Sequence, residues 1–116
     1  TQPIFNKETL EKLFSYIHRI LGIEPQDLDI IVAVSPILDE KTLMFLRERS
    51  GVEIPERLIK PLKDNNRKSI LENFVSHITD LLVEVEDLID NKILYVSSYG
   101  DLEAGLFIAE RLKQIF

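Results

Sequence analysis

Apolar residues in this chain recur mostly at every third or fourth position, which is the spacing of amphipathic helices. The longest such stripe lies between about Arg67 and Leu88 and consists of Ile70, Leu71, Phe74, Val75, Ile78, Leu81, Leu82 and Val85. Another stripe covers residues 7–21, with Asn6 as a candidate N-cap and Gly22 as a C-terminal stop. Both stretches are predicted to be helices that bury one face.

Three further helices are predicted from their start signals. Asp39 is a plausible cap for a helix over residues 40–50, and Pro55 stands at the first position of a short one. Asp101 or Ser98 caps the last helix, and an N-cap role for Asp101 is favoured. The inward residues of that helix are predicted to be Leu102, Leu106, Ala109, Leu112 and Phe116.

Three strands are predicted between these helices. The run Ile30–Val34 is β-branched and does not alternate with polar residues, which indicates a strand covered on both faces in a parallel sheet. Thr1–Phe5 and Lys92–Ser97 are the other two strands. The order predicts an α/β fold of three parallel strands, each followed by a helix, with one extra short helix. A doubly wound sheet and a partial (βα) barrel both fit, although three strands cannot close a barrel.

Composition narrows the class of protein. The 116 residues carry 14 Lys and Arg against 20 Asp and Glu, a formal charge of −6, and they form one predicted domain. Nucleic acid is an unexpected partner, because phosphate binding needs clustered cations. The absence of cysteine fits a reducing compartment, so a cytoplasmic location is expected. No apolar run approaches the roughly 20 residues of a membrane span, so no membrane partner is expected.

Four segments resemble one family. They are Thr1–Asn6, Ile31–Pro36, Phe45–Glu56 with its Gly-Val-Glu-Ile-Pro turn, and Tyr95–Gly105. In this order and spacing they resemble the methylenetetrahydrofolate reductases, flavin enzymes built on an eight-stranded βα barrel. The resemblance covers essentially the whole chain but only the last three βα units. It implies a partial TIM-type barrel, the C-terminal part of such a reductase.

The resemblance also implies a reaction and a cofactor. The family reduces 5,10-methylenetetrahydrofolate to 5-methyltetrahydrofolate with FAD, whose chemistry belongs to the cofactor itself. The residues that hold FAD are expected upstream of Thr1, so this segment alone is expected to be inactive. Its contribution is then one wall of the folate pocket.

Three residues are candidates for that wall, because barrel sites form at the carboxyl ends of strands. By resemblance, Gln2 binds the pterin, and its carboxamide does offer a donor beside an acceptor. Ser35 and Tyr99 follow the second and third strands. The alternatives are that Gln2 satisfies backbone groups, that Ser35 only precedes the proline that stops a strand, and that Tyr99 has no ligand. Asp101 stands where some relatives carry a basic residue for the folate tail.

A different class of function remains open. The chain has no complete catalytic constellation, and its histidines His18 and His77 lack partners at metal-ligand spacing. A non-catalytic α/β interaction module derived from the family is therefore the alternative. Open sheet edges in either case predict self-association or a missing N-terminal barrel segment as partner.

Overall fold

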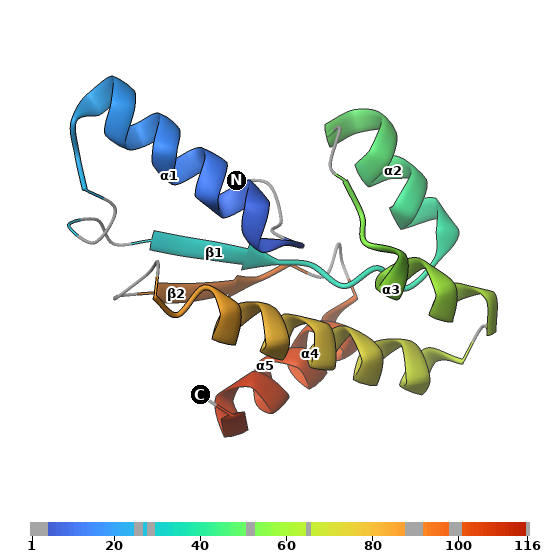
Figure 1. Cartoon of the computed structure of the whole chain (residues 1–116). Helices are drawn as coiled ribbons and strands as arrows, with labels where there is room; N and C mark the ends of the chain where they lie inside the picture. Colours follow the sequence, from blue (N-terminus) through green and yellow to red (C-terminus); the bar gives the residue numbers. More distant parts are fainter. Residues whose placement is uncertain are drawn as a thin grey trace.

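The computed structural model describes residues 5–24, 27, 30–50, 53–64, 66–87, 92–97 and 101–115. Helices account for most of these residues, and they surround one small sheet (Figure 1). The elements in chain order are α1 (Lys7–Leu21), β1 (Ile30–Val34), α2 (Glu40–Ser50), α3 (Glu56–Ile59), the 3₁₀ helix η2 (Lys60–Asp64), α4 (Arg67–Glu84), β2 (Lys92–Val96) and α5 (Leu102–Ile115).

The sheet corrects the predicted fold class. Among the described residues it has two strands, β1 and β2, which pair in parallel from Ile30 opposite Lys92 to Val34 opposite Val96. The expected partial barrel of three parallel strands, each followed by a helix, is therefore wrong. Of the predicted first strand, residues 1–4 lie outside the described residues. The carbonyl of Phe5 accepts a hydrogen bond from Nε2 of His77 at 2.8 Å, so it serves a helix side chain and no strand ladder.

Local capping explains where the helices begin and end. Asn6 and Asn66 precede α1 and α4, and each side chain accepts a hydrogen bond from the amide three residues further on. Asp39 caps α2 in the same way, through the amide of Thr42 at 2.7 Å. Gly22 ends α1 with φ of 67°, a left-handed conformation that favours glycine. The predicted roles of Asn6, Asp39 and Gly22 are confirmed, and Asn66 is a cap that had not been predicted.

The core is built around α4. Its apolar stripe is buried along its whole length, with Phe74, Ile78 and Leu82 at most 1% exposed. Helices α3, η2 and α5 pack against it. The helix itself ends at Glu84 and passes into a turn, earlier than the stripe predicted. Buried Ala104, Ile108 and Leu112 of α5 complete this region.

Two apolar surfaces differ from the sequence-based expectation. In the sheet, Val32 and Val34 are buried, whereas Ile31 on the other face is 66% exposed, so β1 is not covered on both faces. In α5, Leu102 and Leu106 are 72% and 55% exposed instead of facing inward. The chain has two apolar stripes on α5, and α4 covers only the one that contains Ile108.

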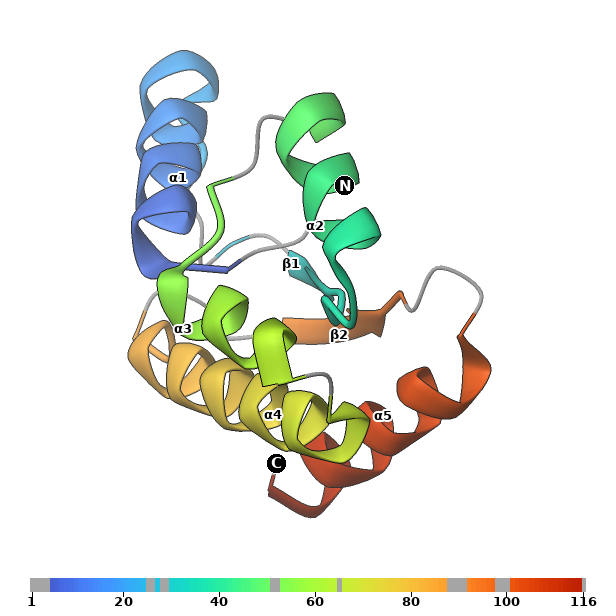
Figure 2. The same ribbon diagram turned by 90° about the vertical axis from the view of Figure 1, so that its right-hand side faces the viewer.

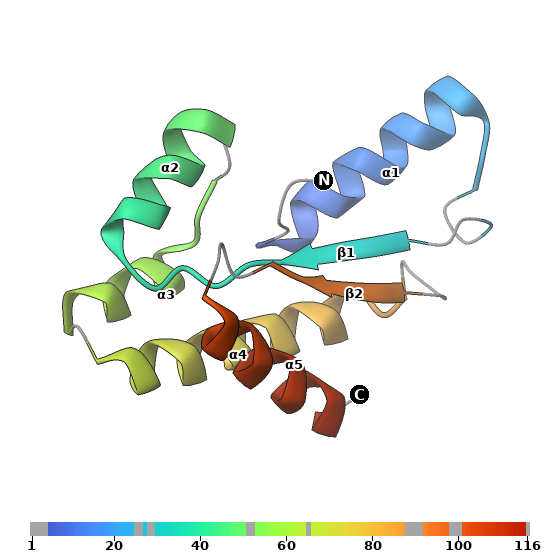
Figure 3. The ribbon, with the colours of Figure 1, turned by 180° about the vertical axis from the view of Figure 1, so that it is seen from behind.

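The spatial arrangement leaves α1 apart from the main body of helices. In all three views the strand pair lies between α1 and α4, and α5 lies beside α4 (Figures 1, 2 and 3). The first turn of α1 remains close to α4, where Nζ of Lys7 is 3.9 Å from Oδ1 of Asp87. The first half of α1 contains its two buried residues, Leu10 and Phe14, and its second half is exposed except for the half-buried Ile17.

Candidate functional site

The two strands end at one edge of the sheet. The amide of Ser97, directly after β2, donates to the carbonyl of Val34 at 3.0 Å, and Ser35 follows at the end of β1. In sheets of parallel strands, ligands bind outside the carboxyl ends of the strands, where the following loops diverge. This carboxyl edge is therefore the place to look for a binding site.

Ser35 is the unusual residue of this edge. It is 1% exposed and is the one buried polar residue in the described part of the chain. Its hydroxyl has no hydrogen-bond partner there. A buried hydroxyl without a partner destabilises a fold by about 1–3 kcal/mol, so such a group calls for an explanation. A ligand or a covering segment that hydrogen-bonds to the hydroxyl would supply one.

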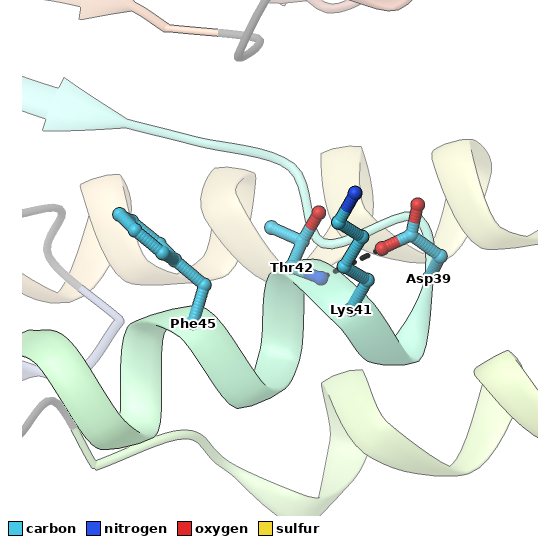
Figure 4. Close-up of a pocket in the computed structure, with 4 residues that line it drawn as sticks. All are labelled: Asp39, Lys41, Thr42 and Phe45. Atoms are coloured by element: carbon cyan, nitrogen blue, oxygen red, sulfur yellow. Dashed lines mark hydrogen bonds between the residues drawn. The ribbon is translucent and has the colours of Figure 1, made fainter.

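A concave surface lies near the start of α2. It has a volume of about 360 Å³ and is lined by Asp39, Lys41, Thr42 and Phe45. Figure 4 shows the four side chains on one side of the helix, with the hydrogen bond from Thr42 to Asp39. The ring of Phe45 is 47% exposed, and the guanidinium of Arg49 lies 6.0 Å from its centroid. The surface combines an exposed ring with charges of both signs.

The start of α5 is held by an ion pair. Asp101 accepts two hydrogen bonds from Nη2 of Arg67, at 2.7 and 2.8 Å, and one from the amide of Ala104 at 3.1 Å. The hydrogen bond from Arg67 is the main cause that lowers the pKa of Asp101 below its usual value, and the same bond raises the pKa of Arg67. Asp101 is thus the N-cap of α5, as predicted, and its charge is paired.

Tyr95 is an exposed aromatic residue that the sequence reasoning did not select. It is 58% exposed on β2, on the face that it shares with its register partner Ala33. Aromatic residues are common in strands, and an aromatic residue in a predicted strand is usually expected to be buried. Only the tertiary arrangement shows that the ring is uncovered.

The predicted site residues have different outcomes. Ser35 lies at the carboxyl edge, whereas Gln2 and Tyr99 lie outside the described residues, and their roles stay predictions. The two histidines are apart: His18 contacts Glu24 at 3.1 Å, and His77 contacts Phe5. In the described ranges no group of three His, Cys, Asp or Glu side chains is placed to hold a metal ion.

The comparisons with known proteins show no relative. No protein-family model, no curated protein and no solved structure matches this chain. Among the helices described, none combines the length and the apolar character that crossing a membrane requires. The fold and the carboxyl edge, together with the sequence motifs, are therefore the basis for assigning a function.

Proposed function

We propose that this chain is the C-terminal part of a flavin-dependent methylenetetrahydrofolate reductase and forms part of its folate pocket. The observation that carries the proposal is the buried hydroxyl of Ser35 at the carboxyl edge, which has no hydrogen-bond partner among the described residues. The four sequence segments that resemble the family support it, because two of them, Ile31–Pro36 and Tyr95–Gly105, meet at this edge through Val34 and Ser97. The substrate is 5,10-methylenetetrahydrofolate and the product is 5-methyltetrahydrofolate.

The pterin ring defines the roles of the edge residues. Its edge alternates hydrogen-bond donors and acceptors, and the Ser35 hydroxyl can serve as either. The exposed ring of Tyr95 offers a flat apolar surface on the uncovered face of the sheet. Gln2 and Tyr99 complete the proposed pocket. All four residues bind and orient the substrate, and none of them transfers a proton or hydride.

The N-terminus of α2 does not suit FAD. Its diphosphate would favour a helix N-terminus, but at α2 that position is taken by the carboxylate of Asp39, which already accepts from Thr42. A second anion there would be repelled. The resemblance puts the residues that hold FAD upstream of Thr1, so the proposal assigns the flavin to a companion polypeptide segment, and the isolated chain should carry no stoichiometric flavin absorbance.

Calorimetric titration with 5-methyltetrahydrofolate tests the folate site. Ser35→Ala should weaken binding about tenfold, the loss expected for one hydrogen bond of roughly 1.4 kcal/mol. Ser76→Ala, on the exposed side of α4, is the matched control and should bind like the unaltered chain. No binding by the unaltered chain, or equal binding by both variants, contradicts the proposal.

A second candidate function is a non-catalytic interaction module. It is favoured by the large apolar side chains that remain exposed on α1, β1, β2 and α5. Mixing the chain with the flavin-carrying companion distinguishes the two functions. Reductase activity that appears only in the mixture supports the enzyme, and a stable complex without activity supports the module.

A further inference from the structure

The exposed side of α1 combines apolar residues with cations. Leu13, Tyr16, Ile20 and Leu21 are 46–62% exposed and form what we call the α1 band. Lys12 and Arg19 are exposed and lie four and three residues from Tyr16, on the same side of the helix. A shallow depression of about 440 Å³ runs along this side and is lined by Glu11, Lys12, Ser15, Tyr16 and Arg19.

The end of α4 has the opposite charge. Val83 is 57% exposed there, and Glu84 and Glu86 are exposed next to it; we call these three residues the α4 end. Within the described residues, neither these carboxylates nor Lys12 and Arg19 belong to an ion pair. Four charges of complementary sign, two on each element, thus accompany the apolar α1 band and the exposed side chain of Val83.

The two surfaces lie on elements that meet at one point, the start of α1. The first turn of α1 adjoins the last turns of α4, because Lys7 lies 3.9 Å from Asp87 and one crevice is lined by Glu8 and Glu84 together. Figure 1 shows both elements at the same end of the strand pair. A two-fold axis near this point would let each copy present both surfaces at once.

We propose that two copies of this chain associate through these two surfaces, with the α1 band of each copy on the α4 end of the other. Pairing α1 with α1 across the axis would leave the α4 end uncovered, and it would bring Lys12 and Arg19 close to the same cations of the second copy, with Glu11 as the one carboxylate among the described residues that line the depression on α1. Placing α1 on the α4 end instead joins cations to carboxylates twice. It also covers the apolar residues of the α1 band and Val83. The proposal is independent of the folate and flavin sites.

Charge reversal provides the test, with molar mass measured by light scattering after size-exclusion chromatography. One variant carries Lys12→Glu and Arg19→Glu, and the other carries Glu84→Lys and Glu86→Lys. In a dimer of either variant alone, like charges face each other at both contacts. The dissociation constant of that dimer should therefore rise about tenfold. An equimolar mixture should recover the dimer, because the α1 of each variant then faces an α4 end of opposite charge.

A control variant and an apolar variant complete the experiment. Lys41→Glu with Arg47→Glu changes the charge by the same amount on α2 and should leave the dimer intact. Ile20→Asp should produce monomers, and circular dichroism should show that all variants stay folded. The proposal is overturned by an unaltered chain that is monomeric at every concentration, by reversed variants that dimerise alone, or by a mixture that stays monomeric. Dissociation of the α2 control would overturn it as well.

Discussion

Helices α4 and α1 have similar caps and amphipathic patterns but very different surroundings. Both begin after an asparagine cap, and both carry one apolar stripe. In α4 the stripe is fully covered, because α3, η2 and α5 pack against it. In α1 only Leu10 and Phe14 are buried, Ile17 is half-buried, and Leu13, Tyr16, Ile20 and Leu21 are exposed. An amphipathic pattern thus identifies the side of a helix that can be buried, while neighbouring elements decide how much of it is buried.

The largest expected effect separates the two helices directly. Phe74→Ala removes a ring that is 1% exposed at the centre of α4 and should lower the free energy of unfolding by about 3–5 kcal/mol. Leu13→Ala removes a side chain that is 46% exposed on α1 and should cost below about 1 kcal/mol. Urea denaturation measures both. Equal losses would contradict the difference in burial.

The end of α1 can be weakened without touching its packing. A Cβ at Gly22 would meet no atom within 4 Å, so Gly22→Ala should cost only the left-handed backbone strain, about 1 kcal/mol. Gly22→Asn should cost less, because asparagine tolerates this conformation. Hydrogen exchange should show the loss in the last turn of α1. An unchanged exchange rate in the last turn would contradict the prediction that the substitution strains the backbone at residue 22.

An asparagine caps both α1 and α4, so the same substitution can be made at the start of each helix. Asn66→Ala should lower the global free energy of unfolding by about 1 kcal/mol, because α4 unfolds with the core. Asn6→Ala removes the same kind of bond from α1 but should mainly speed amide exchange in its first turn. A larger global loss for Asn6→Ala than for Asn66→Ala would show that α1 is as firmly held as α4.

The smallest expected effect is a pH dependence at the junction of α4 and α5. The pKa of Asp101 is lowered from 3.8 by Arg67, so its stabilising contribution is complete above that pH. The contribution is lost as the pH falls through the lower pKa of the folded state. It should be below about 1 kcal/mol, because both side chains are partly exposed. Acid denaturation of Asp101→Asn, which keeps a capping oxygen, should lack this component.

Local features of the fold could be predicted from the sequence. The caps Asn6, Asp39 and Asp101 each use a side chain and an amide three residues away, so neighbouring residues contain the whole signal. The number of strands and the covered faces depend on distant residues. Ile31 belongs to an unbroken apolar run that is typical of a buried strand, yet nothing described covers its face.

The candidate site was predictable to the same limited extent. Ser35 could be placed at the carboxyl end of β1 because the end of that strand is marked by Pro36. Its lack of a hydrogen-bond partner depends on the packing around it and has no local signal. Tyr95 was missed for the related reason that exposure of a strand residue depends on which helices cover the sheet.

The parallel pairing of β1 with β2 has a consequence for synthesis of the chain. Residues 30–34 leave the ribosome long before residues 92–96, and the ladder between them needs both. Until then the nascent β1 has an apolar surface and open backbone groups, and closing such a long loop is slow. Chaperones that bind extended apolar segments should therefore recognise Ile30–Val34 during translation and release it once β2 has emerged.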